Sequence, residues 1–278
     1  MKKINRRSFL AAAGLTAAVL ALTACGGSAS STASSTASSA ASSEAASTSA
    51  AAELTTVEAG KLTMATNAAF PPYEMTTDAG EFEGIDIDTA KAIAEKLGLE
   101  LQIDDMDFDA ALLSVQQGKA DIVMAGVTVT DERKAVMDFS DSYATGIQSI
   151  IVPEGSDITS PDDLAGKKIG TQRGTTGYIY CSDDFGDDAV VAYDDGLTAV
   201  QALNNGQVDA VVIDNAPAKE FVAANPGLVI LDTSYAEEDY AIGLAKGSAL
   251  EDAVNAALEE LKADGTLQSI VDKYITAE

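Results

Sequence analysis

The chain has 278 residues, with 44 acidic against 17 basic side chains and a formal net charge of −27 at pH 7. This charge repels nucleic acids and anionic lipid, so we expect neither as a binding partner. Histidine is absent, which removes Ser–His and Cys–His nucleophiles and the usual zinc ligand. We therefore expect no catalytic residue, metal or cofactor, and the composition favours binding over catalysis.

The first 25 residues are predicted to be an export signal. Four bases between residues 2 and 7 precede an apolar run from Phe9 to Thr23, which is shorter than the about 20 residues that a spanning helix needs. The run ends in Leu-Thr-Ala-Cys25, which resembles the lipobox of bacterial lipoproteins, in which the cysteine is lipidated. An ordinary cleavage site with a chance cysteine is the alternative. Asn5-Arg-Arg-Ser-Phe-Leu also resembles a twin-arginine signal, with a plain basic segment as the alternative.

Residues 26–53 are almost entirely Ser, Ala, Thr and Gly. Such a segment cannot bury a core, so we expect a disordered tether between a lipid and a folded domain. A diacylated Cys25 supplies the two chains that stable membrane attachment requires. The expected location is extracytoplasmic, on the outer face of the cell membrane, with the lipid as the only membrane contact. Cys181 is then the only other cysteine, and we interpret it as structural.

From Leu54 onward, strand and helix patterns alternate at the spacing of βαβ units. This alternation predicts an α/β fold with mostly parallel sheets covered by helices. The C-terminus carries two amphipathic helices separated by Gly265. The expected strands lie at 61–66, 99–103, 122–125, 168–171 and 208–213, and the expected helices lie around 90–97, 108–115, 197–203, 250–261 and 267–274.

An internal repeat connects the two halves of this region. The segment Val115–Gly126 aligns with Leu203–Asp214 at an offset of 88 residues, and each reads as helix end, glycine, aspartate and apolar strand. The repeat predicts two lobes of like construction. The alternative is that two unrelated βαβ units share the same common residues at their element ends. It places Gly126 and Asp214 at matching strand ends, where open α/β sheets bind ligands.

An anion holder is expected at Arg133, which follows Thr130 at the start of a predicted helix. Thr130 is a suitable N-cap, and a guanidinium can bind a carboxylate through two hydrogen bonds. The glycine-rich turn Gly170–Gly177 offers further donors at Thr175 and Thr176. Taken alone, an arginine such as Arg133 is more often half of a surface ion pair than a ligand holder.

Asp214 is the candidate holder for an ammonium group, with helix N-capping as the alternative role. Phe70, Tyr73 and Phe108 are candidate walls for a ligand side chain, with the hydrophobic core as their alternative place.

Four runs carry a resemblance that covers nearly the whole domain. From about Lys61 to Tyr274 the chain resembles the polar amino acid receptors of bacterial ABC importers, the family 3 solute-binding proteins. The resemblance implies a two-lobed, hinged fold of the periplasmic-binding-protein type II. The runs are Ala65–Glu74, Gly84–Ala94, Ala125–Arg133 with Asp138–Asp141, and Val208–Asp214.

The resemblance also implies roles for individual residues. Arg133 binds the ligand α-carboxylate, and Asp214 binds the α-amino group. Aromatic side chains sandwich the ligand side chain. The remaining ligand-binding positions are Gly126, Thr128, Thr175 and Thr176 around the carboxylate, Phe70, Phe108 and Tyr73 as walls, and Asn67 and Gln172, which bear on specificity.

The expected domain organisation follows from the same resemblance. Lobe 1 comprises residues 54–149 and 237–278, and lobe 2 comprises residues 150–236. Two strands near Thr145–Pro153 and Glu237–Gly243 cross between the lobes. The expected protein is a monomer that captures a polar L-amino acid and delivers it to a membrane permease driven by a cytoplasmic ATPase.

The ligand side chain stays open at this level. Receptors for glutamine usually carry charged or histidine residues where this chain has Asn67, Gln172 and Ile213. The surroundings of Gln172 and Asp214 look more like receptors for arginine or other basic amino acids, and aromatic walls suit a cation. Asn67 supplies no charge for a guanidinium, whereas Glu74 is a candidate. Two rival functions on the same fold are a dehydratase-like enzyme and an amino acid sensor.

Overall fold

The computed structural model describes residues 54–275. The predicted export signal, the lipidated Cys25 and the tether lie outside the described residues, so the predictions about them stay predictions. Among residues 54–275, no helix has both the length and the apolar character that a bilayer crossing requires.

Two sheets form the framework, and each combines parallel strands with antiparallel additions. In the first sheet β1 pairs in parallel with β5 and β6, and β14 runs antiparallel to β6. Its strand order is β5 (Glu100–Asp105), β1 (Lys61–Thr66), β6 (Ile122–Val123), β14 (Gly243–Ala245) and β7 (Met137–Phe139). A small separate sheet contains β2 (Ala69–Phe70), β3 (Glu74–Thr76) and β4 (Phe82–Glu83).

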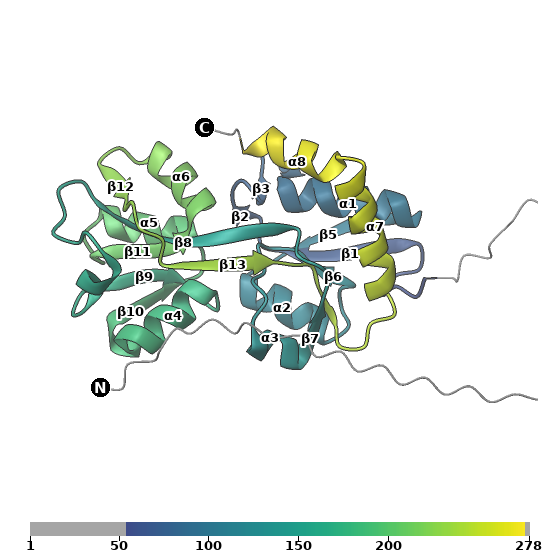
Figure 1. Cartoon of the computed structure of the whole chain (residues 1–278), viewed down its shortest axis with the longest axis horizontal. Helices are drawn as coiled ribbons and strands as arrows, with labels where there is room; N and C mark the ends of the chain where they lie inside the picture. Colours follow the sequence, from purple (N-terminus) through teal and green to yellow (C-terminus); the bar gives the residue numbers. More distant parts are fainter. Residues whose placement is uncertain (1–53, 276–278) are drawn as a thin grey trace, which may run out of the picture. The chain divides into compact units, whose positions relative to one another are not determined.

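The second sheet repeats this plan. Strand β9 pairs in parallel with β10 and β11, and β8 runs antiparallel to β11. Its strand order is β10 (Val190–Tyr193), β9 (Ile169–Gln172), β11 (Ala210–Asp214), β8 (Ala144–Pro153) and β12 (Leu228–Ile230), with β13 (Ala236–Tyr240) also paired to β8. The fold is therefore α/β and two-lobed, as the sequence predicts (Figure 1).

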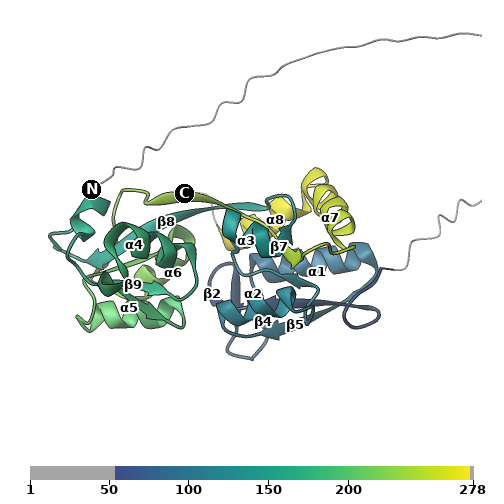
Figure 2. The same cartoon turned by 90° about the horizontal axis from the view of Figure 1, so that it is seen from below.

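Helices cover both sheets, as expected for βαβ units. Helices α1, α2, α3, α7 and α8 accompany the first sheet, whereas α4, α5 and α6 accompany the second (Figures 1 and 2). The helices are α1 (Ile85–Leu97), α2 (Phe108–Gln116), α3 (Asp131–Val136), α4 (Thr176–Phe185), α5 (Gly196–Asn204), α6 (Asn215–Ala224), α7 (Glu251–Ala263) and α8 (Thr266–Tyr274), with 3-10 turns at Pro161–Leu164 and Asp187–Ala189.

The two C-terminal helices pack against α1, and their buried residues follow the expected apolar stripe. Val254, Leu258 and Leu261 of α7 are almost fully buried. Lys96 near the end of α1 forms ion pairs with Glu260 and Asp264 at the end of α7. The C-terminal segment therefore completes the lobe that the first strand begins.

Strands β8 and β13 connect the two lobes. The first half of β8 pairs antiparallel with β13, from Gln148 opposite Ala236 to Ala144 opposite Tyr240. The chain enters the second sheet through β8, and it returns through β13 to β14 of the first sheet. Figure 1 shows both strands running side by side through the middle of the described part.

The internal repeat corresponds to the same local structure in both lobes. Asp121 accepts a hydrogen bond at 2.8 Å from the backbone N–H of Thr63, the third residue of β1. Asp209, at the equivalent position of the repeat, accepts one from Lys168 at 2.7 Å, just before β9. Each aspartate thus ties the start of the central strand to the turn that precedes the next parallel strand.

Cys181 lies inside the second lobe, where its side chain has no exposed surface. Burial raises the pKa of its thiol to about 12, which leaves it protonated at neutral pH and poorly reactive. This environment agrees with a structural role.

Candidate functional site

A cavity opens where the strand ends of the two lobes face each other. The space not filled by protein atoms, including the part open to solvent, is about 310 Å³. Ten of the eleven residues predicted for ligand binding line it, together with two others. The lining residues are Asn67, Phe70, Glu74, Phe108, Ala125, Gly126, Thr128, Arg133, Gln172, Thr175, Thr176 and Asp214.

Arg133 enters the cavity from the first turns of α3. Thr130 is the N-cap of this helix, and its hydroxyl accepts a hydrogen bond from the backbone N–H of Arg133 at 3.1 Å. The guanidinium donates from Nη1 to the carbonyl of Thr128 at 2.8 Å and from Nη2 to the carbonyl of Gly174 at 3.1 Å. The second bond joins the two lobes, because Gly174 belongs to the turn between β9 and α4.

The guanidinium is buried among neutral partners. Arg133 is 8% exposed, its hydrogen bonds go to carbonyl oxygens, and it lies 5.3 Å from the ring centroid of Phe108. Burial lowers its pKa, and the negative charge of Glu238 opposes that shift. An arginine stays charged in such a place, so the site holds a buried cation that a carboxylate of a ligand can neutralise.

Asp214 faces the cavity from the other lobe, at the end of β11. It stands at the N-cap position of α6, yet its side chain makes no capping hydrogen bond. One carboxylate oxygen accepts a bond from the hydroxyl of Tyr240, and the other accepts one from Nε2 of Gln148 at 2.7 Å. Its carboxylate therefore serves contacts within the site rather than helix capping.

The charge of Asp214 is costly in this environment. Burial raises its pKa to about 7, and the nearby charge of Glu238 adds to the shift, whereas the bonds from Tyr240 and Gln148 oppose it. A cation placed beside Asp214 would relieve this cost and favour the ionised carboxylate.

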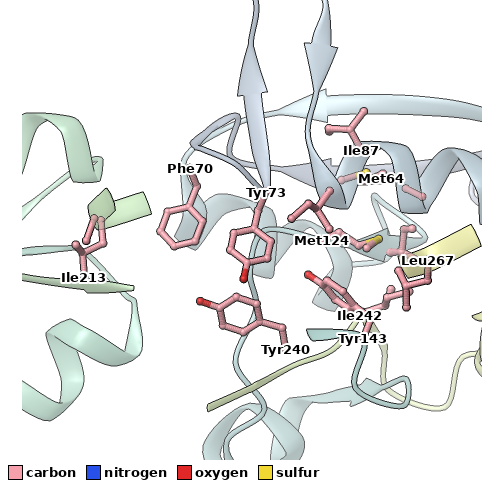
Figure 3. Close-up of a cluster of buried hydrophobic side chains, with 14 of the residues drawn as sticks. Met64, Phe70, Tyr73, Ile87, Met124, Tyr143, Ile213, Tyr240, Ile242 and Leu267 are labelled. Carbon is pink, nitrogen blue, oxygen red and sulfur yellow. The ribbon is translucent and has the colours of Figure 1, made fainter. Parts of the chain in front are cut away.

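Two of the three predicted aromatic walls line the cavity. Phe70 comes from β2, and Phe108 is the first residue of α2. Tyr73 is not a lining residue, because its ring packs into the core behind Phe70. Its centroid lies 6.0 Å from that of Phe70 and 5.2 Å from that of Tyr240, and Figure 3 shows the three rings grouped in this way.

Several small polar groups around Arg133 already make hydrogen bonds within the protein. The hydroxyl of Thr175 caps α4 and donates to the carbonyl of Gln172 at 2.8 Å. The amide of Gly126 donates to Asp86 at 3.0 Å. The hydroxyls of Thr128 and Thr176 face each other across the lobes at 3.5 Å, and the hydroxyl of Thr128 also donates to Glu238 at 3.1 Å.

Asn67 and Gln172 form a second polar bridge between the lobes. Gln172 donates from Nε2 to the side-chain oxygen of Asn67 at 2.9 Å. Asn67 in turn donates to the carbonyl of Met106 at 3.0 Å. Both side chains are neutral amides, so they add hydrogen-bonding capacity to the cavity but no charge.

Glu74 lines the cavity. In the sequence it is only a candidate partner for a guanidinium of the ligand. It has no exposed surface, and neither of its carboxylate oxygens has a hydrogen-bond partner among the described residues. Burial, followed by the charge of Asp86, raises its pKa well above the usual range. Asp86 is also fully buried, and burial raises its pKa to about 6.

Sequence reasoning missed Gln148 and Glu238, which lie behind Asp214 on the strands that connect the lobes. Gln148 and Ser149 are polar residues within the otherwise apolar run Ile147–Val152, and this interruption is a signal that would have marked both as candidates. Glu238 is 6% exposed, yet it lies in the acidic run Ala236–Tyr240, where nothing distinguishes a buried acid from an exposed one.

The arrangement is suited to bind a zwitterion. It offers one buried cation and one buried carboxylate on opposite lobes, two aromatic faces, and a second carboxylate at Glu74. Among residues 54–275 no group of acidic or cysteine side chains is placed to hold a metal ion.

Comparisons with known proteins agree with this geometry. Residues 62–277 match the family model of bacterial extracellular solute-binding proteins, family 3. A probable histidine-binding protein of Neisseria gonorrhoeae is 32% identical over 99% of this chain and 98% of its own.

Two solved structures are similar in fold. The arginine-, lysine-, histidine-binding protein ArtJ of Geobacillus stearothermophilus is 34% identical, with a TM-score of 0.75 over 78% of this chain and 96% of its own. An ancestral arginine-binding protein solved with arginine is 43% identical, with a TM-score of 0.74 over 78% of this chain and 98% of its own. The same ancestral protein was also solved with glutamine. The chain therefore belongs to the family 3 bacterial extracellular solute-binding proteins.

Proposed function

We propose that this protein is the receptor of an ABC importer for L-amino acids with a cationic side chain, arginine foremost. The observation that carries the proposal is the pairing of Arg133 with Asp214 across one cavity. The guanidinium lacks a carboxylate partner among its hydrogen bonds, and the carboxylate has a raised pKa that a cation would lower. An α-carboxylate and an α-ammonium satisfy the two groups at once.

The preference for a basic side chain rests on Glu74. Its carboxylate lines the cavity without a hydrogen-bond partner, and a buried acid of this kind gains most from a cationic partner. Phe70 and Phe108 supply faces for a guanidinium. Relatives named for arginine, lysine and histidine support this choice. A neutral polar ligand is the second candidate, because Asn67 and Gln172 are neutral amides and the ancestral relative was also solved with glutamine.

The wider role follows the family. Lobe 1 (54–149 and 237–278) and lobe 2 (150–236) close over the amino acid by bending at β8 and β13, and the closed form docks on a permease driven by a cytoplasmic ATPase. The protein acts as a monomer, catalyses no reaction, and stands outside the cell membrane on a lipid attached to Cys25. The tether of residues 26–53 gives the domain reach from that anchor.

A thermal-unfolding screen tests the ligand class. The full-length chain is unfolded and refolded in detergent to remove copurified ligand, and then melted with each of the twenty amino acids. A ligand at 1,000 times its Kd adds roughly 4 kcal/mol to the free energy of unfolding, so a true ligand raises Tm clearly. We expect the largest shift with arginine, and unchanged arginine recovered after incubation.

A shift restricted to neutral amino acids would overturn the basic preference. A screen with no shift for any amino acid would overturn the receptor itself. Consumption of the added amino acid would instead favour an enzyme.

A further inference from the structure

The side-chain amide of Gln148 is buried but lies outside the lining of the ligand cavity. It lies on β8, is 1% exposed, and is absent from the residues that line the cavity. Burying an amide away from water is costly unless it makes hydrogen bonds that matter to the fold or to a site.

The amide nitrogen of Gln148 stands between two buried carboxylates. It donates to Asp214 at 2.7 Å and to Glu238 at 2.9 Å, so both of its N–H groups are used on acids. Burial is the largest cause of the raised pKa of Asp214, and the negative charge of Glu238 adds to it. A neutral donor between them holds both in place and brings no charge that would compete with a ligand cation.

Packing fixes the Gln148 side chain in this position. Gly177, in the first turn of α4, leaves the space that the amide occupies, because a Cβ there would lie 2.8 Å from Oε1 of Gln148. The amide therefore reaches Asp214 already oriented, which is the condition for holding a binding group in a productive geometry.

Both oxygens of Asp214 are held by the strands that connect the lobes. Gln148 of β8 bonds one oxygen, and Tyr240 of β13 bonds the other. Figure 3 shows the Tyr240 hydroxyl directed toward the strand that carries Ile213, the residue before Asp214. Because β8 and β13 are paired with each other, a change in their geometry would change the direction in which the Asp214 carboxylate points.

We propose that Gln148 is a positioning residue that aims the Asp214 carboxylate at the ligand ammonium and ties ammonium binding to the geometry of β8 and β13. The inference rests on the proposed function, because it takes Asp214 as the ammonium holder. It assigns Gln148 no contact with the ligand. The other contacts of the Gln148 amide, with Glu238 and at 3.5 Å with the hydroxyl of Thr176, lead to the side of the cavity expected to hold the carboxylate, so an effect through them would weaken ligands with and without the ammonium alike.

The test compares two ligands that differ only in the ammonium. L-arginine and 5-guanidinopentanoate, which lacks the α-amino group, are titrated calorimetrically into the wild-type full-length chain and into Gln148→Leu. Leucine has a similar size and removes the donor. One hydrogen bond to a charged group corresponds to about a tenfold to hundredfold change in affinity. We expect that loss for L-arginine and a change below about threefold for 5-guanidinopentanoate.

Ser149→Ala is the matched control. Ser149 follows Gln148 on β8, and its hydroxyl accepts a hydrogen bond from Asn215, so the substitution removes a bond of the same strand without changing a partner of Asp214. It should leave the affinity for both ligands unchanged. Equal losses for the two ligands in Gln148→Leu would overturn the inference and indicate a general effect on folding. Unchanged arginine binding would also overturn it. If the wild-type chain binds no arginine, the proposed function fails, and the inference falls with it.

Discussion

At the scale of single residues, the site is dominated by buried charge. One guanidinium at Arg133 stands among the acids Glu74, Asp86, Asp214 and Glu238, each less than a tenth exposed. Acids outnumber bases here, so the empty site is electrostatically unfavourable and a ligand with net positive charge improves it. This imbalance has consequences for the charge of the preferred ligand and for the pH dependence of both stability and binding.

Replacing Glu74 by glutamine should change affinity and stability in opposite directions. Glu74→Gln keeps the shape and replaces a fully buried carboxyl group, whose raised pKa reflects the cost of ionising it there, by a neutral amide, so the free energy of unfolding of the ligand-free protein should stay equal or rise. Arginine affinity should fall about tenfold to a hundredfold, as for loss of a charge-assisted contact. Calorimetric titration and chemical denaturation measure the two effects. An unchanged arginine affinity would show that the carboxylate does not meet the ligand side chain.

The raised carboxyl pKa values predict how stability depends on pH. The folded pKa values of Asp86 and Asp214, about 6 and about 7, lie above those of an unfolded chain. Between about pH 4 and pH 7 the folded ligand-free protein therefore binds more protons than the unfolded chain, and its free energy of unfolding falls as pH rises. Denaturant titrations at pH 5 and pH 8 check the sign, and greater stability at pH 8 would contradict it.

Ligand binding should show the opposite dependence on pH. An ammonium on Asp214 favours its ionised form, so binding releases a proton, and arginine affinity should rise about tenfold to a hundredfold from pH 5 to pH 8. Calorimetry in buffers of different ionisation enthalpy counts the released protons. Asp214→Asn should bind weakly and lose most of this dependence.

At the scale of elements, closure of the two lobes over a ligand depends on how closely α2 approaches the turn between β9 and α4. Gly174 in that turn has a φ of +74°, and a Cβ built on it would overlap the carboxylate of Asp109 in α2. Its carbonyl also accepts the bond from Arg133 across the lobes. The glycine is therefore needed for its backbone conformation and for the contact between the lobes.

Gly174→Ala should hinder closure and reduce arginine affinity by at least about tenfold, since the added methyl group meets the other lobe. Gly166→Ala is the matched control, because Gly166 has a φ of +79° with no atom within 4 Å of a built Cβ. It should cost similar stability, about 1 kcal/mol, without loss of affinity. Equal affinity losses in the two variants would show that backbone strain rather than closure is responsible.

Most elements were predictable because their signals are local. Thr130 caps α3 as its position before Asp131 and Glu132 predicts, and Gly265 separates α7 from α8. Strand 122–125 is shorter than expected, since the ladder of β6 ends at Val123 and the chain turns toward Gly126. The pattern of apolar residues cannot show where a ladder of hydrogen bonds ends.

The site was predictable only in part. Arg133 and Asp214 stand at element ends that the repeat and the resemblance identify. Gln148 and Tyr240 contact Asp214 over 66 and 26 residues of sequence separation, and such contacts depend on how β8 and β13 pair. Nothing in the local sequence separates a wall such as Phe70 from a core ring such as Tyr73, because both are buried aromatics.

At the scale of the whole molecule, we propose that the binding domain is attached to the membrane through Cys25, which lies outside the described residues. Cys25→Ser should remove lipidation, so the protein should move from the membrane fraction to the soluble fraction, while arginine affinity stays unchanged. Fractionation of cells followed by titration checks both parts. Retention of Cys25→Ser in the membrane fraction would contradict the anchor, and arginine uptake by cells should fall if the tether is needed for delivery.

The central claim is that Arg133 and Asp214 together hold the two charged groups of an α-amino acid. Its most direct test is a calorimetric titration of the ligand-free full-length chain with L-arginine and D-arginine, repeated with Arg133→Ala. We expect one L-arginine per chain, a clear preference for L over D because two fixed groups define the chirality, and a loss of affinity of about a hundredfold or more in Arg133→Ala. Binding of L-arginine with equal strength by wild type and Arg133→Ala would contradict it.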